Sequence, residues 1–161
     1  MATNVIQGPW GEKPQRDVML EGMKEWRRWV VWRAAPRKDR PGKWDKIPLQ
    51  PANGLNASTA NPAHWDTLDN AWRAYQARQD TVSGIGLVLT VCEGIERASC
   101  RSGVPLFAVD LDHCTTTDVR LTDLFNICPY VELSPSGTGY HGLGFGLLPG
   151  GEIINHEHGV E

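Results

Sequence analysis

The chain has 161 residues, and 40% of them are hydrophobic. That is enough for one compact domain with a hydrophobic core and hardly enough for two, so one domain is the starting expectation. The formal net charge of −3 argues against a protein coated in positive charge. Any contact with nucleic acid must therefore use a local basic patch.

Residues 27–46 provide such a patch. The segment has eight basic and two acidic residues, so its formal charge is +6 and that of the remainder is −9. Trp32 or Trp44 could stack on a base, while the alternative is an ordinary solvated basic loop. The candidate contacts to nucleic acid are the charged side chains Arg37, Lys38, Arg40 and Lys43.

Cysteine spacing and hydropathy indicate the compartment. The four cysteines stand eight or more residues apart and form no C-x-x-C pair of the kind that zinc sites use, so structural thiols in a reducing compartment are expected. Residues 1–13 are polar and unlike a signal peptide, and no apolar run approaches the ~20 residues of a membrane span. We therefore expect a cytoplasmic protein.

The first half of the chain begins with a lead-in, residues 1–14, whose glycines and prolines predict flexibility. A short helix is expected near residues 18–26, and the aromatic and β-branched residues 29–33 predict a strand. Residues 34–54 contain four prolines and two glycines, which exclude a long helix and favour a basic hairpin or extended loop.

A helix is predicted from Pro62, which is a favoured residue at the first helical position. Ser58 or Asn61 could cap it, and apolar residues recur at helical spacing from Trp65 to Tyr75.

Two apolar segments, residues 84–90 and 106–112, predict buried strands, and their nearness in the chain suggests an antiparallel pair. The elements expected after them are a helical segment (117–127), a strand (130–133), a glycine-rich turn (134–139) and a strand (141–148). This order predicts an α+β domain on an antiparallel or mixed sheet, spanning residues 15–161.

Asp110 and Asp112 lie two residues apart at the end of an apolar strand. The period of two places both carboxylates on one face, while Leu111 points into the core. Two acids so placed would repel each other unless a cation bound them, and Mg²⁺ or Mn²⁺ prefers carboxylate oxygen. The alternative is a solvated strand end whose acids cap a turn.

The segment from Ser134 to His141 combines hydroxyls, glycines and an imidazole. Glycine permits close backbone approach, successive N–H groups can form an anion nest, and His141 could donate a hydrogen bond to a phosphate oxygen. The alternative is a plain hairpin followed by a histidine that is satisfied within the fold. The candidate nucleotide ligands of this segment are Ser134, Ser136, Gly137, Gly139 and His141.

The two segments together resemble a known family. FAVDLDH (107–113), followed about twenty residues later by YVELSPSGTGYHG (130–142), is similar to the first two motifs of the archaeo-eukaryotic primase superfamily. The resemblance is closest to the primase-polymerase (bifunctional DNA primase/polymerase) N-terminal domains of phages and plasmids. It extends upstream to WVVWR at residues 29–33 and so covers most of the chain.

The resemblance implies an RRM-like catalytic sheet with a small N-terminal α/β module. It implies that Asp110 and Asp112 hold catalytic metal ions, Mg²⁺ or Mn²⁺, and that His141, Ser136 and Lys46 contact the triphosphate of an NTP or dNTP. A single-stranded DNA template and a helicase or other replication protein would be partners, in the cytoplasm of a bacterium or phage-infected cell.

In that family a third acidic residue on a later strand completes the metal site. Glu161 is the candidate here, in both a catalytic and a metal-binding role. As the last residue of this sequence it has no following strand residues to hold it, so an incomplete metal site and weak catalysis are expected.

Three functions remain open at this point. The first is a nucleotidyltransferase that initiates or extends a strand on a single-stranded template. The second is a catalytically incomplete relative that binds nucleotide, nucleic acid or a protein partner. The third is a metal-dependent phosphohydrolase or nuclease, because a D-x-D pair and a histidine also serve those sites.

Overall fold

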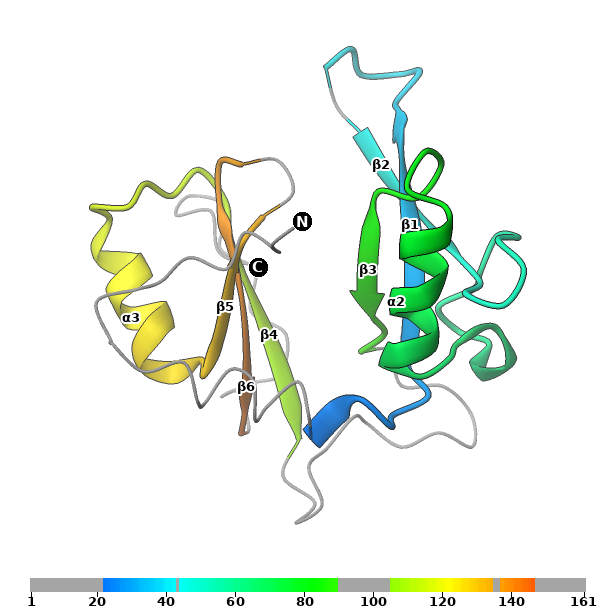
Figure 1. Cartoon of the computed structure of the whole chain (residues 1–161). Helices are drawn as coiled ribbons and strands as arrows, with labels where there is room; N and C mark the ends of the chain where they lie inside the picture. Colours follow the sequence, from blue (N-terminus) through cyan, green and yellow to red (C-terminus); the bar gives the residue numbers. More distant parts are fainter. Residues whose placement is uncertain (1–21, 43, 90–104, 135–136, 147–161) are drawn as a thin grey trace. The chain divides into compact units, whose positions relative to one another are not determined.

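The computed structural model describes residues 22–42, 44–89, 105–134 and 137–146 (Figure 1). These residues fall into two compact units, an N-terminal unit (residues 22–89) and a C-terminal unit (residues 105–146). Among the described residues, each unit has a three-stranded antiparallel sheet together with α-helix, which confirms the α+β class. Within the described residues no helix is both long and apolar enough to cross a membrane.

The sheet of the N-terminal unit has the strand order β2-β1-β3. Its strands are β1 (Trp29–Pro36), β2 (Trp44–Leu49) and β3 (Gly84–Leu87). The strand expected at residues 29–33 is thus confirmed and is longer than predicted. β1 and β2 form the hairpin that was one of the two forms expected for the basic segment, and Val31 lies opposite Leu49 in their register.

The helix predicted to begin at Pro62 is broken into two pieces. A short 3₁₀ helix, η1 (Pro62–His64), is capped by Asn61, and the α-helix α2 (Leu68–Ala77) begins later, with Thr67 as its cap. Asp66 lies between them and exchanges two backbone hydrogen bonds with Trp29, which hold it in an extended conformation. The start of the predicted helix was therefore wrong, because pairing with the sheet outweighs local helix propensity.

The C-terminal unit places one helix against a sheet of order β4-β6-β5. Its elements, in chain order, are β4 (Leu106–Leu111), α3 (Val119–Ile127), β5 (Tyr130–Leu133) and β6 (Tyr140–Phe145). The predicted helix and both later strands are confirmed, with β6 described as far as Phe145. Leu111, Leu124, Val131 and Tyr140 are buried together in the core between α3 and the sheet.

The expected antiparallel pairing of residues 84–90 with 106–112 was wrong. β3 pairs with β1 and β4 pairs with β6, so the two strands belong to different sheets. Shape complementarity explains the partner of β3, since a Cβ at Gly84 would lie 2.8 Å from the Trp32 ring. β3 thus fits against β1 only because glycine leaves room for that indole.

The lead-in at residues 1–14 and the beginning of the helix expected near residues 18–26 lie outside the described residues. Residues 22–23, within that predicted helix, are helical, whereas residues 24–26 are not.

Gly142 of β6 tests the packing of α3 on the sheet. A Cβ at this position would lie 2.6 Å from Leu124 Cδ1 and 2.7 Å from Cys128 Sγ. We therefore expect Gly142→Ala to lower the free energy of unfolding by about 1–3 kcal/mol through overpacking, measured by urea denaturation. Gly86→Ala is the control, because its Cβ would meet Val30 at an ordinary 3.6 Å. Equal effects of the two substitutions would contradict this packing.

Candidate functional site

Three side chains form a row across the sheet of the C-terminal unit. Asp110 of β4 and Glu132 of β5 both lie opposite His141 of the central strand β6. His141 Nδ1 is 3.2 Å from Glu132 Oε1, and His141 Nε2 is 3.6 Å from Asp110 Oδ1. The neighbouring Gly142 faces α3, so the alternation of strand side chains puts this row on the opposite face of the sheet.

Both carboxylate oxygens of Glu132 have partners. Oε1 pairs with His141 Nδ1, and Oε2 accepts a hydrogen bond from the Tyr130 hydroxyl. An ionised carboxylate has no proton to give, so Nδ1 must donate in the first pair. Glu132 therefore fixes the orientation of the His141 ring rather than offering a free oxygen to a ligand.

Sequence reasoning missed Glu132, although a signal for it was present. The turn at residues 134–139 joins two predicted strands, and counting outward from it pairs Leu133 with Tyr140 and Glu132 with His141, as the structure does. Register in a hairpin follows from the turn that closes it, so the pair could have been read from the chain.

Asp110 differs from Glu132 in what its oxygens contact. Its side chain is 41% exposed, yet Oδ1 is buried and has no hydrogen-bond partner among the residues that the structure describes. The 3.6 Å contact to His141 is too long for a hydrogen bond. A buried acceptor without a donor is costly, and a bound cation would satisfy it.

Asp112 lies directly after the end of β4 and is exposed. Leu111, between the two aspartates, is buried in the core as the alternation predicted. Within the described ranges, no group of three or more His, Cys, Asp or Glu side chains is arranged to hold a metal ion. Glu161 lies outside those ranges, so its assignment as third ligand stays a prediction.

The serine and glycine turn packs onto the end of β4. A Cβ at Gly139 would lie 2.2 Å from the Leu111 carbonyl oxygen, so only glycine allows this approach. Gly137 has φ 74° and its N–H donates to the Ser134 carbonyl, so one amide of the proposed anion nest already has an acceptor. Ser134 is buried, and Ser136 lies outside the described residues.

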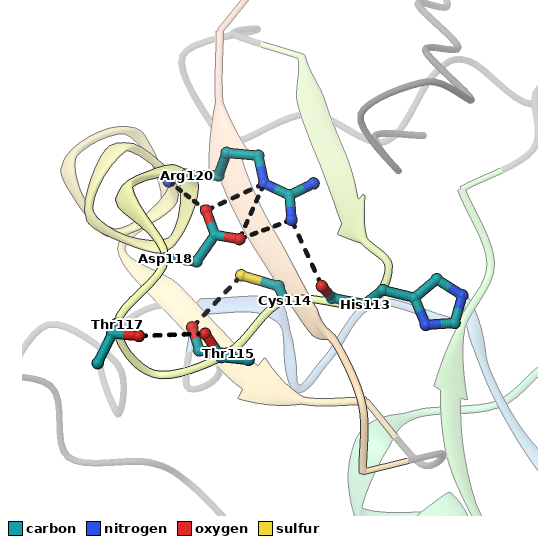
Figure 2. A network of polar contacts seen from close by, with 6 residues as sticks. All are labelled: His113, Cys114, Thr115, Thr117, Asp118 and Arg120. Atoms are coloured by element: carbon teal, nitrogen blue, oxygen red, sulfur yellow. Dashed lines mark hydrogen bonds and ion pairs between the residues drawn. The ribbon is translucent and has the colours of Figure 1, made fainter.

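The loop between β4 and α3 is held by a network of polar contacts (Figure 2). Asp118 caps α3 and binds the Arg120 guanidinium, whose Nη2 also lies 3.5 Å from the His113 carbonyl oxygen. The Cys114 N–H donates to the Thr138 carbonyl at 3.0 Å and so joins this loop to the serine and glycine turn. The chain directly after the aspartate pair is thereby fixed.

Two of the cysteines are free, buried thiols, in agreement with the expected structural role. Burial raises the pKa of Cys128 to about 12, and burial and the nearby Asp118 raise that of Cys114. Both thiols are therefore protonated at neutral pH. Cys92 and Cys100 lie outside the described residues.

The predicted nucleic-acid contacts lie in the hairpin of the N-terminal unit. The half-buried Arg37 pairs with Asp39 and Asp45, and the exposed Arg40 pairs with Asp39. Such pairs near the surface contribute little to stability. Lys38 is exposed as well, and Lys43 lies outside the described residues.

Lys46 and the two tryptophans of the hairpin differ in accessibility. Lys46 Nζ lies 5.9 Å from the centre of the Trp32 ring, which is packed over Gly84. Trp44 is 63% exposed, so of these two aromatic side chains it is the one available for stacking. Lys46 belongs to the N-terminal unit, whereas Asp110 and His141 belong to the C-terminal unit.

An α+β unit that aligns two carboxylates and a histidine across neighbouring strands, beside a glycine-rich turn, suits the binding of phosphates and divalent cations.

No protein-family model matches the chain. The chain is similar to a DNA Primase-polymerase from Nitratiruptor phage NrS-1, with 31% identity over 144 residues and 86% of the chain covered. The chain spans 17% of the length of that phage protein. This similarity supports the relationship to primase-polymerases that the two motifs indicated.

The Asp118 and Arg120 pair predicts a specific response to acid. Hydrogen bonds from the Arg120 side chain and backbone N–H lower the pKa of Asp118 from 3.8 to about 2. The folded state stabilises the ionised carboxylate of Asp118, so this carboxylate makes its full contribution to the free energy of unfolding above pH ~4. The contribution is lost as the pH falls towards 2. Across this pH range, urea denaturation should show that the difference in the free energy of unfolding between the wild type and Asp118→Asn becomes smaller as the pH falls. A difference independent of pH would contradict the pairing.

Proposed function

We propose that this chain is a metal-dependent nucleotidyltransferase domain that binds an NTP or dNTP and a single-stranded DNA template. It synthesises or extends a primer in the replication of a mobile element. The observation that carries the proposal is the position of Asp110 beside His141, with one Asp110 oxygen lacking a donor. The similarity to a phage DNA Primase-polymerase supports it.

The aspartate pair fits a divalent cation. The unpartnered oxygen of Asp110 and the exposed carboxylate of Asp112 are hard donors of the type that Mg²⁺ and Mn²⁺ select. Glu161 would supply the third carboxylate. When bound, the metal ions would neutralise phosphate charge and favour deprotonation of the attacking 3′-hydroxyl.

His141 would hold the triphosphate. Its Nδ1–H is committed to Glu132, so the Nε2 atom points to the side where Asp110 lies. In the charged ring Nε2 also carries a proton and can donate a charge-assisted hydrogen bond to a phosphate oxygen. The serine and glycine turn, with Ser134, Ser136, Gly137 and Gly139, would surround the same phosphates.

The template would lie along the basic hairpin. Its exposed cations can neutralise backbone phosphates, and the exposed Trp44 offers a face on which a base can stack. A helicase or another replication protein would deliver the single strand. The hairpin residues proposed for this contact are Arg37, Lys38, Arg40 and Lys43, with Lys46 directed to the triphosphate.

The metal and nucleotide sites are tested together by removing the aspartates. In calorimetric titration with a triphosphate and Mn²⁺, the Asp110→Asn, Asp112→Asn double variant should lose the metal-dependent binding. Primer extension should fall ~100-fold or more, because in-line transfer depends on tightly positioned groups. Asp123→Asn, an exposed aspartate on α3, is the matched control and should change neither quantity.

Two outcomes of that experiment contradict parts of the proposal. Unchanged metal-dependent binding in the double variant would show that the aspartates are not the ligands. Normal triphosphate and DNA binding by the wild type with no primer extension would favour the alternative, a primase-like protein that binds without catalysis.

Glu132 is predicted to act as a positioning residue for His141. Glu132→Ala should weaken triphosphate binding roughly tenfold, the lower end of the range seen when the group that orients a metal-bound histidine is removed. Glu132→Gln keeps an acceptor for Nδ1–H and should lose less affinity. Tyr130→Phe removes the hydrogen bond to the other oxygen and leaves the contact between Glu132 and His141 in place.

Nitrogen chemical shifts of the His141 ring distinguish positioning from a purely structural effect. The shifts should change in Glu132→Ala and stay close to those of the wild type in Tyr130→Phe. Identical ring shifts and affinities in Glu132→Ala and the wild type would refute the role of Glu132.

A further inference from the structure

The N-terminal unit contains a pocket that the proposed function does not use. Its volume is about 600 Å³, and it lies between β1, β2, the loop that follows β2 and the segment that follows α2. Arg33, Leu49 and Val82 contribute to its walls, and Arg78 reaches it from the end of α2. This volume is within the range of small-molecule sites.

The described lining of the pocket has two cations and no acidic side chain. The Arg33 side chain makes no ion pair or hydrogen bond with the described residues. Arg78 donates through Nη2 to the Pro51 carbonyl, and its Nη1 has no hydrogen-bond partner among the described residues. The guanidinium groups of Arg33 and Arg78 line the pocket with N–H donors, and a bound anion would supply acceptors for them.

The loop after β2 is shaped around the Arg78 guanidinium. Gly54 has φ 77°, and a Cβ there would lie 2.6 Å from Arg78 Nη1, so glycine lets the loop close over that nitrogen. The Asn56 side chain also lines the pocket and makes no hydrogen bond with the described residues. Leu49 and Leu55 add apolar surface beside these polar groups.

We propose that this pocket binds a phosphate group of a nucleotide or of a DNA strand, through Arg33 and Arg78. Arginine forks match phosphate oxygens in pairs, and the Asn56 amide can donate to the same group. The apolar wall formed by Leu49 and Leu55 suits the sugar or base attached to that phosphate. Binding here needs no metal ion, and Asp110 and His141 take no part in it.

The experiment is an NMR titration of the full chain in EDTA, which silences metal-dependent binding. Inorganic phosphate is the first probe, followed by dTMP and by oligothymidylate with and without a 5′-phosphate. Saturable shifts of the Asn56 side-chain amide and of the Arg33 and Arg78 Nε–H signals are expected. The probes distinguish the sources of the phosphate. Binding of dTMP indicates that the pocket takes a free nucleotide, and binding only of the oligonucleotide with a 5′-phosphate indicates a strand end. Equal binding of both oligonucleotides indicates internal phosphates of a strand.

Substitutions then assign the contacts. Arg33→Gln and Arg78→Gln should each weaken binding about tenfold, whereas Arg73→Gln, an exposed arginine of α2 outside the pocket, should not. Asn56→Asp preserves the shape of the side chain and adds a negative charge, so it should weaken phosphate binding by a similar factor. If Arg78→Gln fails to fold, Asn56→Asp still tests whether phosphate binds in this pocket.

Equal affinities in the wild type, Arg33→Gln and Asn56→Asp would overturn the proposal, as would the absence of saturable shifts with every probe. Either result leaves the metal-dependent site untouched, because that site is measured with Mn²⁺ and reports on Asp110 and Asp112. Conversely, loss of primer extension in the aspartate variants has no bearing on the pocket.

Discussion

The register of β6 between its two neighbours determines the arrangement of the candidate site. His141 faces Asp110 on one side and Glu132 on the other only while both strand pairs keep their observed alignment. A slip of one residue in either pair would turn the carboxylate of that strand to the opposite face of the sheet. The glycines of β6 and the turn help to fix the alignment, since Gly142 accommodates α3 and Gly139 accommodates the end of β4.

The contacts around this row constrain the backbone directly after the aspartate pair. His113 adopts φ 49°, an uncommon conformation for a residue with a side chain, immediately after Asp112. The Arg120 guanidinium lies near its carbonyl, and the backbone bond from Cys114 to Thr138 ties the same loop to the serine and glycine turn. The loop that carries Asp112 is therefore held in part by Cys114 and Arg120, which lie outside both motifs, so a search for motifs does not reveal these contacts.

The sequence predicted the elements better than their partners. The strands at residues 29–33 and 130–133 and the helix near residues 117–127 were recovered because each has a local pattern. The pairing of residues 84–90 and the start of α2 were not, because they depend on contacts with Trp32 and Trp29 far away in the chain. Asp110 and His141 were proposed from motifs, and Glu132 could have been proposed from the register of its hairpin, whereas the Arg78 pocket required tertiary structure.

Asp110 and Glu132 lie in one row on the same sheet, yet the two carboxylates differ in their ability to bind a cation. Each faces the same imidazole, yet both oxygens of Glu132 are already bound, one to His141 and the other to the Tyr130 hydroxyl. Asp110 keeps an oxygen without a donor, and β4 ends one residue later, where Asp112 adds a second negative charge. A cation would therefore be drawn to the β4 side of the histidine, and a phosphate that reaches the cation would meet His141 Nε2 on the same side.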